Sequence, residues 1–100
     1  MSLCHDLADR IVNSKIDSSD HKIIESSNSA ILDTIGVTLI GSKSEATRSV
    51  ITALDAKNLS DGVLIYGKKL KVSPLDAAMI NGTSSHALDF DDCNNTMGGH

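Results

Sequence analysis

The sequence predicts a mainly α-helical fold of about four helices, interrupted by one short hairpin or extended connector. Three observations lead to this prediction. Apolar residues recur at intervals of three and four along most of the chain, Ser and Asp stand where helices should begin, and strand-like character is confined to residues 63–66. Since Tyr66 and Phe90 are the only aromatic residues, the core must be built from aliphatic side chains.

The first helix is expected over residues 2–13, where Leu3, Leu7 and Ile11 recur every four positions and make one face apolar. Ser2 stands directly before this run and suits the N-cap position. The segment thus predicts a short amphipathic helix.

A longer helix is expected from Asp20, as the N-cap, to about Ile40. Its apolar residues cover more than a surface stripe, so we expect it to be buried on most sides. Gly41 suits a left-handed C-terminal cap, whereas Gly36 inside the helix suggests a close helix crossing.

Ser42 and Glu45 form a capping-box pattern, which predicts a third helix reaching Leu54 or Lys57. The turn signal at 61–62 and the apolar run at 63–66 then predict the hairpin or connector.

Ser73, Pro74 and Asp76 predict the start of a fourth helix, because Pro suits the first helical position and an acidic side chain favours the first turn. This helix should end at His86 or Leu88, where Asp, Asn and Gly begin to dominate and predict a loop.

Charge and cysteine content restrict the classes of function. Thirteen acidic and nine basic residues give a net charge of −4, and the cations are scattered apart from a cluster at 68–71, which makes nucleic acid an improbable partner. No apolar run approaches the roughly 20 residues needed to span a bilayer. Cys4 and Cys93 lack the spacing of a zinc site and predict a reducing, cytoplasmic location.

The chain shows no internal repeat or linker, so we treat it as one structural unit. The second and fourth predicted helices are apolar around more of their circumference than three partner helices can cover. We therefore expect a fragment of a larger helical domain, with exposed helical surface available for homo-oligomer formation.

The C-terminal fifteen positions concentrate groups that can carry chemistry: His86, Asp89, Asp91, Asp92, Cys93 and His100. One interpretation is general acid–base catalysis, since neighbouring carboxylates raise each other's proton affinity and histidine exchanges protons near neutral pH. A second is a solvated acidic loop that caps the helix. A third is a divalent metal site, although the EF-hand, HExxH and CxxC patterns are all missing. Composition alone leaves these three open.

Several segments in the same order resemble the MmgE/PrpD family. They are Leu-Asp-Thr-Ile-Gly at 32–36, Gly-Ser at 41–42, Ser-Pro at 73–74, Asn-Gly-Thr at 81–83 and His-Ala-Leu-Asp-Phe-Asp-Asp at 86–92. The resemblance implies the N-terminal portion of a helical domain, whose lid domain and C-terminal helices this sequence lacks. It also implies dehydratase, decarboxylase or epimerase chemistry on small di- and tricarboxylic acids, such as 2-methylcitrate dehydration, without a metal or other cofactor, in a dimer.

Carried over by position, the resemblance makes Asp89 and His100 the catalytic candidates. Cys93 stands where members often have threonine, and we expect Cys93, His86 and Asp92 to contact substrate. The cationic groups that a polyanionic substrate needs would come from outside this chain, so the isolated polypeptide should be inactive. The alternative is a non-catalytic helical module that self-associates or binds a partner.

Overall fold

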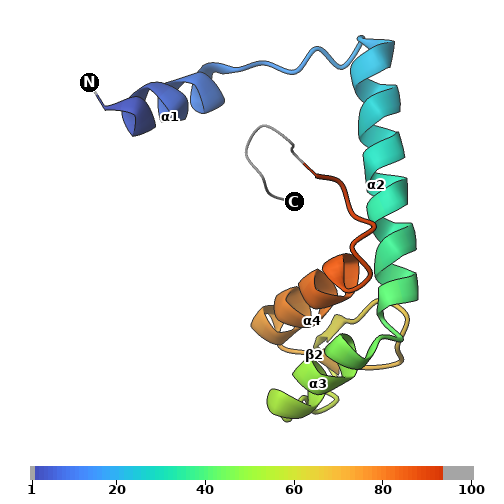
Figure 1. Ribbon diagram of the computed structural model, residues 1–100. Coiled ribbons are helices and arrows are strands. Elements are labelled where there is room, and N and C mark those ends of the chain that lie inside the picture. Colours follow the sequence, from blue (N-terminus) through green and yellow to red (C-terminus); the bar gives the residue numbers. More distant parts are fainter. Residues whose placement is uncertain (1, 94–100) are drawn as a thin grey trace.

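The structure, a computed structural model, describes residues 2–93 of the 100-residue chain. In chain order the elements are α1 (Leu3–Asn13), α2 (His21–Gly41), α3 (Glu45–Ala53), β1 (Val63–Leu64), β2 (Lys71–Val72) and α4 (Pro74–His86). This order confirms the prediction of a mainly α fold with one short hairpin (Figure 1).

The packed part of the molecule consists of α3, α4, the hairpin and the C-terminal end of α2 (Figure 1). Four fully buried apolar side chains form its core: Ile65, Val72, Ala77 and Ile80. Partly buried side chains from α3, from the segment just after it and from the connection between β1 and β2 pack around them. The core therefore lies between α4, α3 and the antiparallel pair β1–β2, in which Val63 faces Val72.

Both ends of α4 agree with the sequence prediction. The Ser73 hydroxyl oxygen accepts a hydrogen bond from the backbone N–H of Asp76 at 3.2 Å, and Pro74 occupies the first helical position. The helix ends at His86. This rigid element, which buries Ala77, Ile80 and Ser84, carries the acidic loop at its C-terminal end.

The start of α2 is also as predicted, because the Asp20 carboxylate accepts hydrogen bonds from the backbone N–H groups of Lys22 and Ile23. The expectation that α2 is buried on most sides was wrong. Only Thr38 and Gly41 are buried along it, since α4 covers its C-terminal end and the rest projects away from the packed part (Figure 1).

The close helix crossing lies at Gly41 rather than at Gly36. A Cβ atom added to Gly41 would come within 1.9 Å of the backbone oxygen of Ser84, whereas one added to Gly36 would meet nothing within 4 Å. Gly41 is the last residue of α2 and the cap that follows, Ser42, is right-handed, so the predicted left-handed cap was also wrong. Contact with α4, rather than a turn, requires glycine at position 41.

The predicted capping box of α3 starts two residues too early. Ser44 is the N-cap, and its hydroxyl oxygen accepts from the backbone N–H of Thr47 at 3.1 Å. The Ser42 hydroxyl instead donates to the backbone oxygen of Leu39. The helix ends at Ala53, because Asp55 enters the left-handed region at φ 46° and the predicted extension to 57 fails.

The first helix forms as predicted but buries no residue. Leu3, on its apolar face, is 84% exposed. A segment without regular secondary structure separates α1 from α2, and α1 stands apart from the packed part (Figure 1). Among residues 2–93, no helix combines the length and apolar character that crossing a membrane demands.

Candidate functional site

The candidate site lies in the turn that follows α4. His86 is the last helical residue, and the backbone N–H of Asp89 donates a hydrogen bond to its carbonyl oxygen at 2.9 Å. Asp89 adopts a left-handed conformation with φ 56°, which Asp enters more readily than most residues do. The turn therefore brings the chain back toward the end of the helix instead of continuing along its axis.

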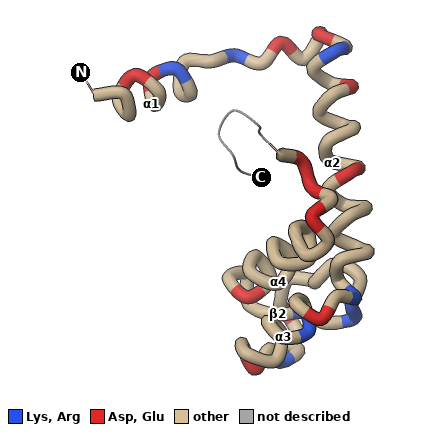
Figure 2. Tube along the Cα trace, in the orientation of Figure 1, with Lys and Arg blue, Asp and Glu red and all other residues tan. Residues whose placement is uncertain are grey.

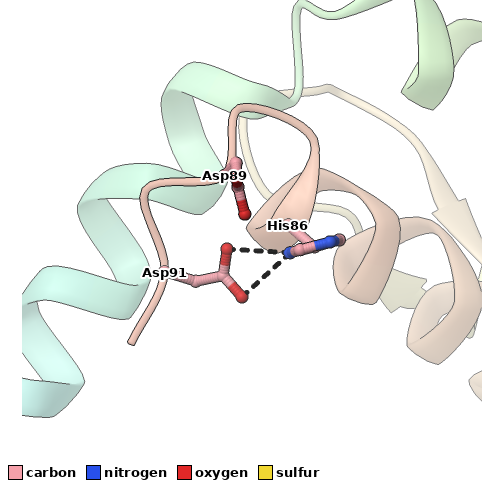
Figure 3. A group of neighbouring side chains, drawn as sticks. All are labelled: His86, Asp89 and Asp91. Carbon is pink, nitrogen blue, oxygen red and sulfur yellow. Dashed lines mark hydrogen bonds and ion pairs between the residues drawn. The ribbon is translucent and has the colours of Figure 1, made fainter. Parts of the chain in front are cut away.

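The reversal places Asp91 against the imidazole of His86 (Figure 3). His86 Nδ1 lies 2.9 Å from Oδ1 and 3.1 Å from Oδ2 of Asp91. The hydrogen bond to Asp91, followed by the charge of Asp91, raises the pKa of His86 above its ordinary value of 6.5. The charge of Asp89 adds a smaller rise, and partial desolvation opposes it. The protonated imidazole therefore persists to higher pH than in an isolated histidine.

Asp89 joins the same cluster. One ligand-type atom from each of His86, Asp89 and Asp91 lies within 4.8 Å of the other two. His86 is 57% exposed and Asp91 only 17%, so the imidazole is the more accessible partner of the pair. Such a group of two carboxylates and one imidazole can exchange protons with a ligand in the turn. Groups of exposed acidic residues are also common without a metal ion.

The sequence argument selected His86 and Asp89, and the structure brings them together. The two residues meet across a turn rather than on one helical face, because α4 ends at His86. Asp92 and Cys93 are both exposed in the segment beyond Asp91. His100 lies outside the described residues, so its proposed role stays a prediction.

Asp91 belonged to the candidate group of residues in the sequence, but no catalytic or substrate-binding role was predicted for it. The two adjacent carboxylates differ in the structure, since Asp91 is half-buried against His86 and Asp92 is exposed. A separation of five residues across an irregular turn has no characteristic spacing in sequence. Only the left-handed turn at Asp89 reveals the pairing of His86 with Asp91.

Charge is unevenly distributed around the cluster. In Figure 2 acidic residues mark the chain just after α4, whereas basic residues gather around α3 and β2. The sequence contains no Lys or Arg after Lys71. The turn therefore provides acid–base groups together with net negative charge, and the imidazole of His86 is the group of the cluster that can become cationic.

Residues 5–100 match the family model described as the MmgE/PrpD N-terminal domain. The chain belongs to the MmgE/PrpD family. The cluster of His86, Asp89 and Asp91 thus lies within the matched N-terminal domain, as the resemblance of residues 86–92 predicts.

Two curated relatives of this MmgE/PrpD chain are cis-aconitate decarboxylases. The Homo sapiens protein is 30% identical over 94 residues, and the Mus musculus protein is 28% identical over 92 residues. Each alignment covers 91% of this chain and 19% of the relative. The chain therefore spans about a fifth of the length of the curated relatives it matches. No solved structure matches it significantly.

Proposed function

We propose that this chain supplies part of the active site of a metal-independent lyase or isomerase that acts on small di- or tricarboxylic acids. The observation that carries the proposal is the cluster of His86, Asp89 and Asp91, held at the end of a packed helix within the family-matched region. The similarity to cis-aconitate decarboxylases makes a lyase the favoured class.

The proposed chemistry is proton transfer at a carbon beside a carboxylate, as dehydration, decarboxylation and epimerisation of such acids all require. Asp89 is the catalytic candidate that gives or takes this proton, with His100 as its predicted partner. His86 is exposed enough for a ligand to reach, and an imidazolium is a suitable donor to a substrate carboxylate. Asp92 and Cys93 are expected to contact the rest of the substrate.

The charge distribution supports the proposal that the site is incomplete in this chain. Asp89, Asp91 and Asp92 give the turn more negative than positive charge, and the sequence offers no Lys or Arg beyond position 71. A di- or tricarboxylate approaching this turn would meet like charge, which is unfavourable unless cations pair with it. Cationic groups from outside these 100 residues would have to complete the site.

The first experiment incubates the purified 100-residue chain with cis-aconitate and with 2-methylcitrate, and follows products by proton NMR. No turnover is expected. Turnover would disprove the proposed incompleteness of the site.

A chimera tests the chemistry itself. The matched segment of the human cis-aconitate decarboxylase is replaced by this chain, and decarboxylation is measured beside the Asp89→Asn variant. A folded chimera, checked by its thermal transition, should turn over cis-aconitate and lose at least about 100-fold in kcat with Asp89→Asn. A folded chimera whose activity survives Asp89→Asn would exclude Asp89 as the catalytic group.

Metal independence is tested separately by dialysis against a chelator. We expect no divalent ion to remain in stoichiometric amount and the activity of the chimera to be unchanged. Recovery of one bound ion per chain, lost in the Asp91→Asn variant, would instead favour a metal site at His86, Asp89 and Asp91.

A non-catalytic module that self-associates is the second candidate function, and one observation favours it. Large apolar side chains are exposed along α2, among them Ile23, Ile24, Ile31, Leu32, Leu39 and Ile40. Contiguous exposed apolar surface commonly marks an interface. Light scattering over a range of concentrations tests this candidate: a monomer that binds no apolar dye would exclude it.

A further inference from the structure

Two contacts tie His86 to the chain on either side of Asp89. The carbonyl oxygen of His86 accepts the backbone N–H of Asp89 at 2.9 Å. The imidazole Nδ1 of His86 faces both carboxylate oxygens of Asp91, two residues further on, at 2.9 and 3.1 Å. One residue at the end of a helix therefore fixes the turn through its backbone and through its side chain (Figure 3).

Asp89 lies between these contacts and has a backbone conformation that its surroundings must stabilise. Its φ of 56° lies in the left-handed region, where the Cβ atom of an L-residue crowds the following carbonyl group. A residue held in such a conformation persists only when its surroundings determine it. The direction of the Asp89 carboxylate depends on this backbone conformation, because the Cα–Cβ bond turns with the backbone.

We propose that His86 and Asp91 are positioning residues that hold Asp89 in its left-handed conformation and thereby fix the direction of the Asp89 carboxylate. The purpose of that carboxylate rests on the proposed function, whereas the positioning itself rests on the contacts alone. In this proposal Asp91 acts on Asp89 through its contact with His86, and no contact with the substrate is assigned to it.

The anchor for this arrangement is α4. Ser84, two residues before His86, is fully buried, and its hydroxyl donates to the backbone oxygen of Ile80 at 2.9 Å. The Ser84 hydroxyl also lies 3.1 Å from that of Thr47 in α3. His86 therefore extends from a part of the helix that is fixed against its neighbours, and groups built on such elements are held more accurately than groups on loops.

Asp92 provides a matched control. It is the next residue along the chain, carries the same carboxylate and is exposed. Removal of its charge changes the net charge of the turn by the same amount as removal of that of Asp91. An effect specific to Asp91 therefore reports the contact with His86 rather than general repulsion among the acidic residues.

The test measures, by NMR on the 100-residue chain, the intraresidue NOE between the amide and α protons of Asp89, which are closer at positive than at negative φ. We expect Asp91→Ala and His86→Ala each to reduce this NOE by about half or more, as Asp89 returns to the commoner negative φ. Asp91→Asn should retain most of it, because the amide oxygen can still accept from Nδ1–H. Asp92→Ala should leave it unchanged.

An unchanged NOE in Asp91→Ala would overturn the proposal, and so would an equal loss in Asp92→Ala. The amide signals of Ile65 and Ile80 establish that each variant keeps its core, since both side chains are fully buried. The positioning of Asp89 and its proposed catalytic role can be disproved independently. If Asp91→Ala releases Asp89 while Asp89→Asn leaves the chimera active, the positioning stands and the proposed catalytic role of Asp89 fails.

Discussion

The contact between His86 and Asp91 shows how one neighbouring carboxylate shifts the protonation equilibrium of an imidazole. His86 is the last residue of α4, where the negative end of the helix dipole favours a cation. The carboxylate of Asp91 adds a hydrogen bond and a charge, and both raise the pKa of His86. Because the imidazole is largely exposed, solvent screens these effects. The consequence is a shifted titration rather than a large contribution to stability.

The raised pKa of His86 makes the stability of the turn depend on pH. The folded-state pKa of His86 is raised above its ordinary value of 6.5, so protonated His86 stabilises the turn fully below pH 6.5. That contribution is lost as the pH rises through the folded-state pKa. Titration of the His86 ring protons by NMR should therefore give a pKa above 6.5 in the native sequence.

Asp91→Asn removes the charge and should lower the pKa of His86 toward 6.5, whereas Asp92→Asn should lower it less. An equal fall in both variants would contradict the pairing. It would mean that the net charge of the turn, and not the contact at 2.9 Å, controls the protonation of His86.

At the scale of elements, the crossing of α2 and α4 depends on a single glycine. The backbone oxygen of Ser84 occupies the space that a Cβ atom at position 41 would need. Beside this contact, the Thr47 hydroxyl donates to the backbone oxygen of Gly41 at 2.9 Å and lies 3.1 Å from the hydroxyl of Ser84. Thr47 and Ser84 are fully buried, so three helices meet at a small polar junction.

We predict opposite effects of alanine at the two glycines of α2. Gly41→Ala should lower the free energy of unfolding by about 1–3 kcal/mol or more, because backbone atoms must move to admit the new methyl group. Gly36→Ala should raise it by about 0.5–1 kcal/mol, since the site is open and alanine favours the helix. Urea denaturation followed by circular dichroism measures both. Equal changes in the free energy of unfolding for the two variants would mean that no close helix crossing lies at position 41.

Sequence predicts a feature of a helix well when the residues that determine it are close together in the chain. The caps at Asp20 and Ser73 were predictable, since each acts on backbone groups two or three residues away. The role of Gly41 was not, because it depends on a helix more than 30 residues further along the chain. The start of α3 was misplaced because Ser42 and Ser44 both offer a hydroxyl at a plausible distance from the helix.

Sequence likewise predicts only part of the candidate site. His86 and Asp89 could be selected because they belong to a recognisable run of residues, and the structure places them in one cluster. The pairing of Asp91 with His86 could not be predicted, because it depends on a left-handed turn at Asp89. The local sequence has no signal for that turn, such as a glycine at position 89. Sequence selected candidate residues for the site but did not predict the contact between His86 and Asp91.

For the whole described molecule, burial is concentrated at one end. The core of Ile65, Val72, Ala77 and Ile80 lies between the hairpin, α3 and α4, whereas α1 and most of α2 are exposed. Cooperative stability should follow this distribution, because buried apolar area is the main favourable term in folding. The chain therefore contains one small packed unit with two helical segments that contribute little to it.

Deletion of α1 tests this division directly. Removing residues 1–14 should change the free energy of unfolding by no more than about 0.5 kcal/mol, because no side chain of α1 is buried. Ile80→Ala, at the core, should lower it by about 2–5 kcal/mol. An isolated helix of 11 residues is marginal in water, so the α1 amides should also exchange with solvent much faster than those of α4. Slow exchange in α1, or a stability loss on deletion comparable to that of Ile80→Ala, would mean that the apolar face of Leu3, Leu7 and Ile11 packs against another surface in solution.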